Sequence, residues 1–196
     1  MLNRLSHTQL LRYAGLFTWA VVGIPLMVLA WNFPAGGAEA AEGEGYRLPG
    51  LTVASVVYLA FGLIYWQVTR ALGMRNPRPI DIVTLAALTV SAIAVSYQTG
   101  TGMGAVLMMI IAGVIPWLVP LRVGVIWLIL QNAALVPVFS QMEGFTPGFA
   151  VLQAMLYVGY SSFAMVIGLV SKQQAEARDE QRQLNAELRA SRALLA

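Results

Sequence analysis

The sequence predicts an all-α membrane protein: a six-transmembrane-helix bundle whose last helix continues into a cytoplasmic coiled coil. Three observations predict this fold. The 196 residues are 58% hydrophobic and only 11% charged, whereas soluble domains carry about 25% charged residues. Six apolar segments have lengths near the roughly 20 residues that a helix needs to cross a bilayer. After Gly168, neither Pro nor Gly interrupts the chain as far as Ala196.

Turn-forming segments separate the six predicted spans. Residues 32–50 are rich in Gly, Ala and Glu, two prolines lie in 76–79, three glycines lie in 99–104, and Pro147 lies in the segment 141–148. The fourth and fifth spans are short, because only Val119 to Arg122 separates them. The predicted spans are Gly15 to Trp31, Leu51 to Val68, Ile80 to Tyr97, Met103 to Leu118, Val123 to Phe139 and Phe149 to Val170.

Basic residues fall on one side of the predicted membrane. Lys and Arg in short loops mark the cytoplasmic side, and six spans with both termini in the cytoplasm satisfy this rule at every loop. We therefore expect a multi-pass protein of the bacterial inner (cytoplasmic) membrane, with the lipid bilayer as its surroundings. The basic residues of this side are Arg4, Arg12, Arg70, Arg75, Arg78, Arg122, Lys172, Arg178 and Arg182; the opposite side receives Glu39, Glu42, Glu44, Arg47 and Glu143.

The first span permits a second interpretation. Arg4 and Arg12, the apolar stretch and the small-residue run from Ala38 to Ala40 together imitate a cleaved signal peptide. The apolar run is longer than a usual signal core, and Trp31 occupies the position of an interfacial anchor. We therefore expect the first span to be retained; its cleavage would leave five spans and an otherwise unchanged topology.

The C-terminal segment shows a heptad pattern. We therefore divide the chain into a six-span transmembrane domain, 1–171, and a cytoplasmic coiled-coil linker, 172–196. One stripe of the helix carries amides near the membrane and leucines further out. This is the pattern of an a/d coiled-coil seam whose part nearest the membrane pairs weakly. The stripe therefore predicts a homodimer through this helix. The alternative is a solvated amphipathic tail that pairs with nothing. The stripe consists of Val170, Gln174, Ala177, Gln181, Leu184, Leu188, Ser191 and Leu195.

The heptad pattern is still running at Ala196. We therefore expect the chain to be the front part of a longer protein, with a downstream output domain that this sequence lacks. The alternative is a natural end that frays.

Several polar and small residues lie within the predicted spans. The amides Gln131, Asn132 and Gln153 have no water at that depth and should face the bundle, where hydrogen bonds between helices explain them. Asp81 follows the start of the third span, where a capping role is favoured over a proton or ion site. Small residues suited to close helix contacts are Gly62, Gly113, Gly159, Gly168, Ser161 and Ser162.

No catalytic site is indicated. The chain has no cysteine, its single histidine is His7, and no Walker-type phosphate-binding sequence occurs. The same inventory offers no metal site and no cofactor site. The net charge is +3, and the basic residues lie at the ends of the spans. Membrane topology explains this placement, whereas a nucleic-acid-binding surface would gather basic residues on one face.

The helix from Tyr157 to Lys172 and the connector from Gln173 to Ala196 resemble the sensor region of bacterial two-component sensor histidine kinases, in particular the DesK-like group. In that family such a helix enters a dimerisation domain with a phosphoacceptor histidine, followed by an ATP-binding domain. The resemblance implies that a membrane or envelope stimulus passes through the sixth helix and the coil to a kinase core. ATP, Mg²⁺ and a response regulator would then bind only to the absent domains. No catalytic residue of the family has a matching position here.

Two other functions remain open. A six-span sensor can feed a different output domain, such as a diguanylate cyclase, through the same kind of coil. A small membrane transporter or channel would use Gln131, Asn132 and Gln153 as its pathway. The long charged C-terminal helix argues against transport, because a transporter does not need it.

Overall fold

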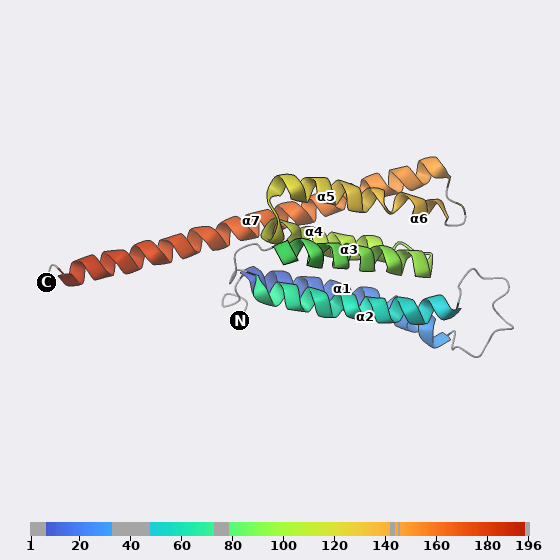
Figure 1. Cartoon of the computed structure of the whole chain (residues 1–196), viewed down its shortest axis with the longest axis horizontal. Coiled ribbons are helices and arrows are strands. Elements are labelled where there is room, and N and C mark those ends of the chain that lie inside the picture. Colours follow the sequence, from blue (N-terminus) through green and yellow to red (C-terminus); the bar gives the residue numbers. More distant parts are fainter. Residues whose placement is uncertain (1–6, 33–47, 73–78, 142–143, 145, 195–196) are drawn as a thin grey trace.

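A computed structural model describes residues 7–32, 48–72, 79–141, 144 and 146–194, and their regular secondary structure is entirely α-helical. Consecutive passes along the bundle run in opposite directions, so that α1 begins and α7 emerges at the same end (Figure 1). The helices are α1 (His7–Asn32), α2 (Leu48–Ala71), α3 (Pro79–Thr99), α4 (Met103–Leu118), α5 (Leu121–Ala133), α6 (Val136–Ser140) and α7 (Pro147–Leu194).

Five segments of the described chain are long and apolar enough to cross a membrane: Thr8–Val28, Val53–Arg70, Ile80–Thr99, Leu121–Ser140 and the apolar part of Pro147–Arg192. Helix α4 has the bounds expected for the fourth span, but its 16 residues extend only about 24 Å at 1.5 Å per residue. That length is below the roughly 30 Å of a hydrocarbon core. The all-helical membrane architecture therefore agrees with the sequence, while the count of six spans stays a prediction.

The predicted fifth span consists of two helices. Helix α5 ends at Ala133, α6 begins at Val136, and the turn between them is closed by a bond from the Leu135 N–H to the Asn132 carbonyl at 3.1 Å. Pro137 explains the break, since it has no N–H to give to the carbonyl of Ala133 four residues earlier. The two helices still form one continuous pass along the bundle (Figure 1).

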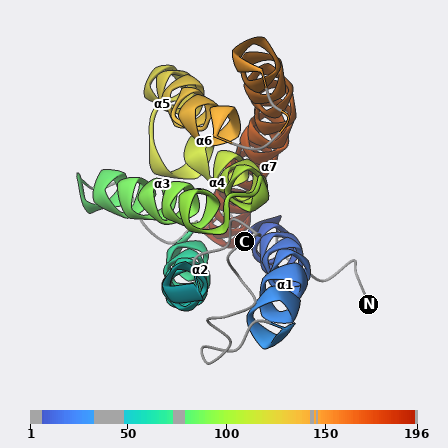
Figure 2. The ribbon, with the colours of Figure 1, turned by 90° about the vertical axis from the view of Figure 1, so that its right-hand side faces the viewer.

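Helix α4 lies at the centre of the bundle. It packs against α1, α3, α5 and α7, and the view along the bundle shows these helices around it (Figure 2). Most of its side chains are buried, and Met109 is its only exposed residue. By contrast, only 17% of the apolar window of α1 is buried. The shortest apolar pass is therefore the core of the protein, and α1 lies at the periphery.

Aromatic rings packed on glycines join α1 to α2. A Cβ atom at Gly15 would lie 2.0 Å from the Tyr65 hydroxyl, and one at Gly62 would lie 2.5 Å from the Trp19 ring. Trp19 also stacks on Tyr58 with ring centroids 5.4 Å apart, and its indole N–H donates to the Tyr58 carbonyl at 3.1 Å. The expected close contact at Gly62 is confirmed, and it is made with a side chain rather than with a backbone.

A backbone contact at Gly104 joins α3 to α4. A Cβ atom there would lie 2.0 Å from the carbonyl oxygen of Ala92, and the Gly104 N–H donates to the Ser96 hydroxyl at 3.0 Å. This bond satisfies one of the N–H groups that the first turn of any helix leaves without a partner. Gly104 was not among the small residues that the sequence predicted to make close helix contacts.

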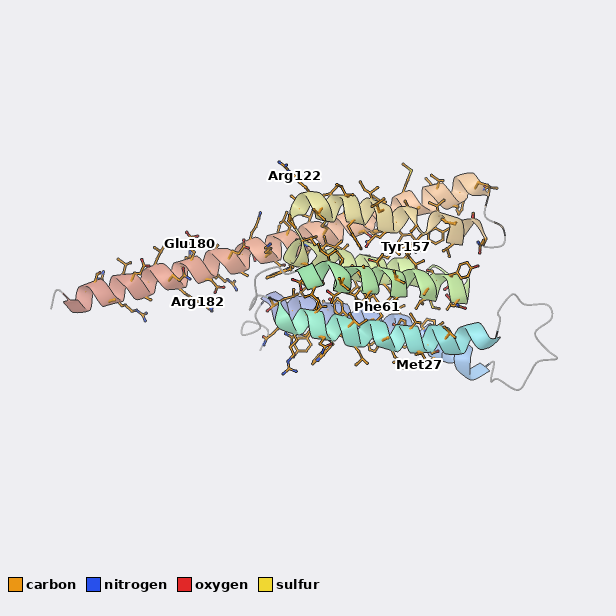
Figure 3. All side chains as sticks on the ribbon, in the orientation of Figure 1. Met27, Phe61, Arg122, Tyr157, Glu180 and Arg182 are labelled. Carbon is orange, nitrogen blue, oxygen red and sulfur yellow. The ribbon has the colours of Figure 1, made fainter. Side chains whose placement is uncertain are left out.

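Helix α7 runs without interruption from the bundle into the projecting segment (Figure 1). Its 48 residues extend about 72 Å at 1.5 Å per residue. Glu180 and Arg182 lie on the projecting part, away from the other helices (Figure 3). The prediction of one continuous C-terminal helix is confirmed as far as Leu194.

We predict that Gly104→Ala destabilises the bundle by about 1–3 kcal/mol, because the added methyl group must displace the backbone of α3. Gly159→Ala is the matched control, since nothing lies within 4 Å of the corresponding Cβ position. Thermal unfolding of the purified protein in detergent, followed by circular dichroism, measures both. Equal unfolding temperatures for the two variants would contradict the close contact at Gly104.

Candidate functional site

A second close contact between helix backbones joins α4 to α7. A Cβ atom built on Gly168 would lie 2.1 Å from the carbonyl oxygen of Gly113. Only a residue without a side chain permits this approach, because any larger residue would clash with the backbone of α4. The expected close contacts at Gly113 and Gly168 are confirmed, whereas the one expected at Gly159 is wrong within this chain.

A lysine fixes the same crossing one turn further along. The Lys172 ammonium group donates a hydrogen bond to the carbonyl oxygen of Pro116 at 2.9 Å. Within a helix this carbonyl would accept from the N–H of residue 120, but residue 120 is a proline and has none. The positive charge also lies at the C-terminal end of α4, where the helix dipole favours a cation. Lys172 is therefore a cap supplied to α4 by α7.

We call the pair of contacts, Gly113 with Gly168 and Pro116 with Lys172, the α4–α7 joint. It lies where α7 leaves the bundle. The charged hydrogen bond from Lys172 holds the two helices together, and the backbone contact at Gly168 sets how closely they approach. The joint therefore connects the central helix of the bundle to the root of the projecting helix.

A second cation makes a comparable contact at the same end of the bundle. The Arg12 guanidinium group of α1 donates to the carbonyl of Thr69 in the last turn of α2 at 3.4 Å, and it lies 5.5 Å from the centroid of the Trp66 ring. Arg70 and Arg122 lie in the last turn of α2 and the first turn of α5, also at this end. Of the other charges used to predict the orientation, Arg4, Glu39, Glu42, Glu44, Arg47, Arg75, Arg78 and Glu143 lie outside the described residues.

The heptad stripe lies on the free part of α7. Gln174, Ala177, Gln181, Leu184 and Leu188 are all exposed, and the two leucines are exposed by 53% and 56%. Leu195 lies outside the described residues. A single chain leaves this stripe uncovered, and its pairing with a second copy stays a prediction.

Two of the three expected intramembrane amides are buried. Gln131 donates to the carbonyl of Met108 in α4 at 3.4 Å, and Asn132 donates to the carbonyl of Leu128 at 2.8 Å. The side-chain oxygens of both, and the hydroxyl of Ser161, are buried and have no hydrogen-bond partner. Gln153 is half-buried. Gln131 thus forms a hydrogen bond between helices, whereas the bond of Asn132 lies within α5.

Asp81 lies in the first turn of α3. A carboxylate there interacts favourably with the positive end of the helix dipole. The expected capping role of Asp81 stays a prediction. In the described residues, no three side chains of the types His, Cys, Asp and Glu are grouped so as to hold a metal ion.

Sequence reasoning missed the role of Lys172, which it used only for orientation. One signal was present: Pro120 four residues after Pro116 means that the Pro116 carbonyl lacks its usual donor. The sequence could not show which residue supplies the donor instead, because Lys172 lies 56 positions away.

Comparison with protein-family models, curated proteins and solved structures gave no match.

We predict that Lys172→Met destabilises the protein by about 1–3 kcal/mol, because it leaves the buried Pro116 carbonyl without a donor. Lys172→Arg should retain most of the stability, since it keeps a charged donor. Gln173→Met is the matched control for an added apolar side chain at an exposed neighbouring position. Thermal unfolding in detergent measures all three, and equal effects of the methionine variants at 172 and 173 would contradict the cap.

Proposed function

We propose that this chain is the membrane sensor and signal-transmission module of a two-component histidine kinase. In this function, a stimulus in the membrane or envelope alters the packing of the bundle, and α7 passes the change to a kinase core that follows the chain. The observation that carries the proposal is the α4–α7 joint at the root of one uninterrupted 48-residue helix. ATP, Mg²⁺ and the response regulator would bind to the kinase core and its partner domain.

The proposed topology has six spans, with α5 and α6 forming one of them, and both termini in the cytoplasm of a bacterial cell. The grouping of Arg12, Arg70, Arg122 and Lys172 at the end where α7 emerges supports this orientation, since basic residues favour the cytoplasmic side. Helix α4 is short for a span, but it is enclosed by its neighbours and has little contact with lipid. Its length therefore need not match the hydrocarbon thickness.

In the proposed mechanism, the projecting part of α7 pairs with its counterpart in a homodimer. Gln174 and Gln181 place amides in the seam nearest the membrane, and polar seam residues weaken one register relative to others. Two arrangements that differ by a few kcal/mol are enough for switching. A displacement of α4 acting through Lys172 and Gly168 would select between them.

The same features also suit a six-span sensor with another output, such as a diguanylate cyclase. The exposed stripe of α7 would pair in the same way, and only the domain that follows the coil would differ. The crosslinking experiment below tests the coil that both functions require, and autophosphorylation of the intact protein with ATP distinguishes the kinase from the cyclase.

We predict that cysteines placed singly at Leu184 and Leu188 form disulfides between two copies of the chain in native membranes. Cysteines at Arg182 and Arg189, which flank the seam, should crosslink much less. The chain has no cysteine of its own, so non-reducing gel electrophoresis after mild oxidation reports each position directly. Uniformly weak crosslinking at all four positions would remove the dimeric coil and favour a monomeric membrane protein.

We also predict that the double variant Gln174→Leu/Gln181→Leu raises the crosslinking yield at Leu184, because two apolar seam residues replace amides near the membrane. In the intact protein the same variant should hold the coil in one signalling state. Replacement of exposed Gln173 and Gln183 by leucine is the matched control, since neither lies on the stripe. An unchanged response to stimulus in the seam variant would refute the register mechanism.

A further inference from the structure

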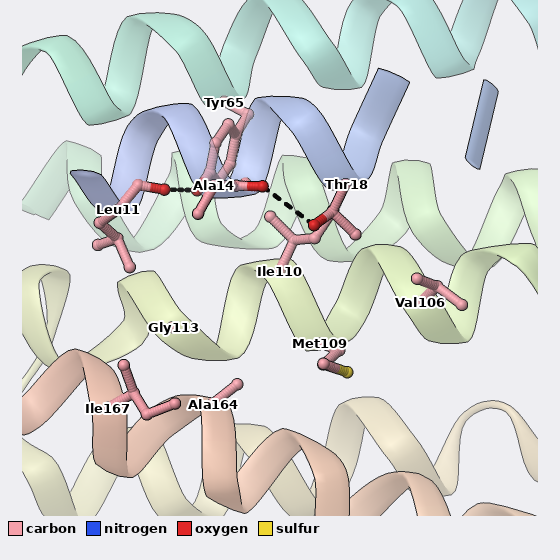
Figure 4. Close-up of a pocket in the computed structure, with 11 residues that line it drawn as sticks. Leu11, Ala14, Thr18, Tyr65, Val106, Met109, Ile110, Gly113, Ala164 and Ile167 are labelled. Carbon is pink, nitrogen blue, oxygen red and sulfur yellow. Dashed lines mark hydrogen bonds between the residues drawn. The ribbon is translucent and has the colours of Figure 1, made fainter. Parts of the chain in front are cut away.

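A pocket of about 140 Å³ lies between α1, α4 and α7 (Figure 4). Its walls are apolar except for the hydroxyls of Thr18 and Tyr65. The Thr18 hydroxyl donates to the Ala14 carbonyl at 3.0 Å, and the Tyr65 hydroxyl donates to the Leu11 carbonyl at 3.4 Å, so both already have partners within the protein. An apolar cavity of about 150 Å³ accommodates a benzene-sized group and does not attract water. The pocket therefore suits an apolar occupant.

The pocket opens at the surface of the bundle, because an exposed residue of each of the three helices lines it: Ala14 of α1, Met109 of α4 and Ile167 of α7. Met109 is the only exposed residue of α4, with 36% of its surface accessible. The flanking helices carry large apolar side chains on their outer surfaces, such as Phe17 of α1 and Phe163 of α7, exposed by 71% and 67%. Phe17 and Phe163 lie within predicted spans and Met109 lies within the apolar central helix, at the depth where a bilayer consists of acyl chains. The material at the mouth is therefore lipid hydrocarbon.

The two ends of the pocket differ. Thr18 and Met109 lie near the middle of their helices, whereas Leu11 and Ile167 lie toward the end at which Arg12 and Lys172 are found. A phospholipid whose acyl chain runs along the pocket toward Thr18 and Met109 has its headgroup at the level of Arg12 and Lys172. The arrangement thus matches the polarity of a phospholipid as well as the volume of part of its chain.

We propose that this pocket binds one acyl chain of a membrane phospholipid. Gly113 lines the pocket and is also one half of the α4–α7 joint, and Ala164 and Ile167 lie next to Gly168 on α7. The bound chain therefore contacts both helices of the joint and alters their packing when it is exchanged or displaced. This consequence for signalling rests on the proposed function; the binding itself does not.

A photoreactive residue at position 109 tests the binding. A diazirine-bearing methionine analogue replaces Met109 alone in the full chain, which is reconstituted in vesicles of phosphatidylethanolamine and phosphatidylglycerol, irradiated and analysed by mass spectrometry. The expected product is a phospholipid adduct. The same analogue placed at Val90 of α3, which is 64% exposed, gives the yield of lipid adduct for a residue in open contact with lipid. Placed at Leu107, which is fully buried, it gives the background yield.

Two variants then close the pocket from opposite walls. Ala164→Phe and Ala14→Phe should each lower the lipid adduct at position 109 by about fivefold, because a phenyl ring occupies most of a benzene-sized cavity. Val90→Phe adds the same ring on an open lipid-facing surface and should leave the adduct at 109 unchanged. Circular dichroism verifies that each variant is folded, and the two closing variants are independent, so one that fails to fold does not remove the test.

The result that overturns the proposal is an adduct at 109 no greater than at 107, an adduct to a second copy of the chain instead of lipid, or a lipid adduct that both closing variants leave unchanged. These outcomes do not depend on signalling. Loss of crosslinking at Leu184 and Leu188 with a retained lipid adduct would refute the proposed function and keep the lipid site.

Discussion

The contact between the backbones of Gly113 and Gly168 is the constraint on which the arrangement of the bundle depends. It brings α7 so close to α4 that Lys172 reaches the last turn of α4. The pocket between α1, α4 and α7 lies beside the same contact, because Gly113 lines it. In hydrocarbon, helices gain nothing from apolar burial alone, so association relies on close packing and on hydrogen bonds. The joint uses both of these at adjacent turns.

Satisfying backbone carbonyls at helix ends is the second requirement, because lipid offers no donors. The protein meets it with side chains from neighbouring helices: Lys172 of α7 serves α4, and Arg12 of α1 serves α2. Each cation therefore links two helices while it neutralises a polar end. The two cations thus hold this end of the bundle together.

The sequence predicted the helices well, since apolar runs and turn residues are local features; the bounds of Met103–Leu118 were found without a structure. It did not predict which helix is central. Gly113, Gly159 and Gly168 look alike in the sequence, yet only the first and third touch, because their partners depend on the three-dimensional arrangement. Pro120 indicated an orphaned carbonyl but not its donor. The pairing of the heptad stripe depends on a second chain, which no intramolecular pattern describes.

The stiffness of α7 has a mechanical consequence. From Lys172 to Leu194 the helix is a straight lever about 33 Å long, at 1.5 Å per residue. A tilt of about 10° at its root therefore carries the tip sideways by about 6 Å, which is more than half of the roughly 8–10 Å that separates the axes of packed helices. A small change of angle at the joint thus becomes, at the far end, a displacement that is large on the scale of helix packing.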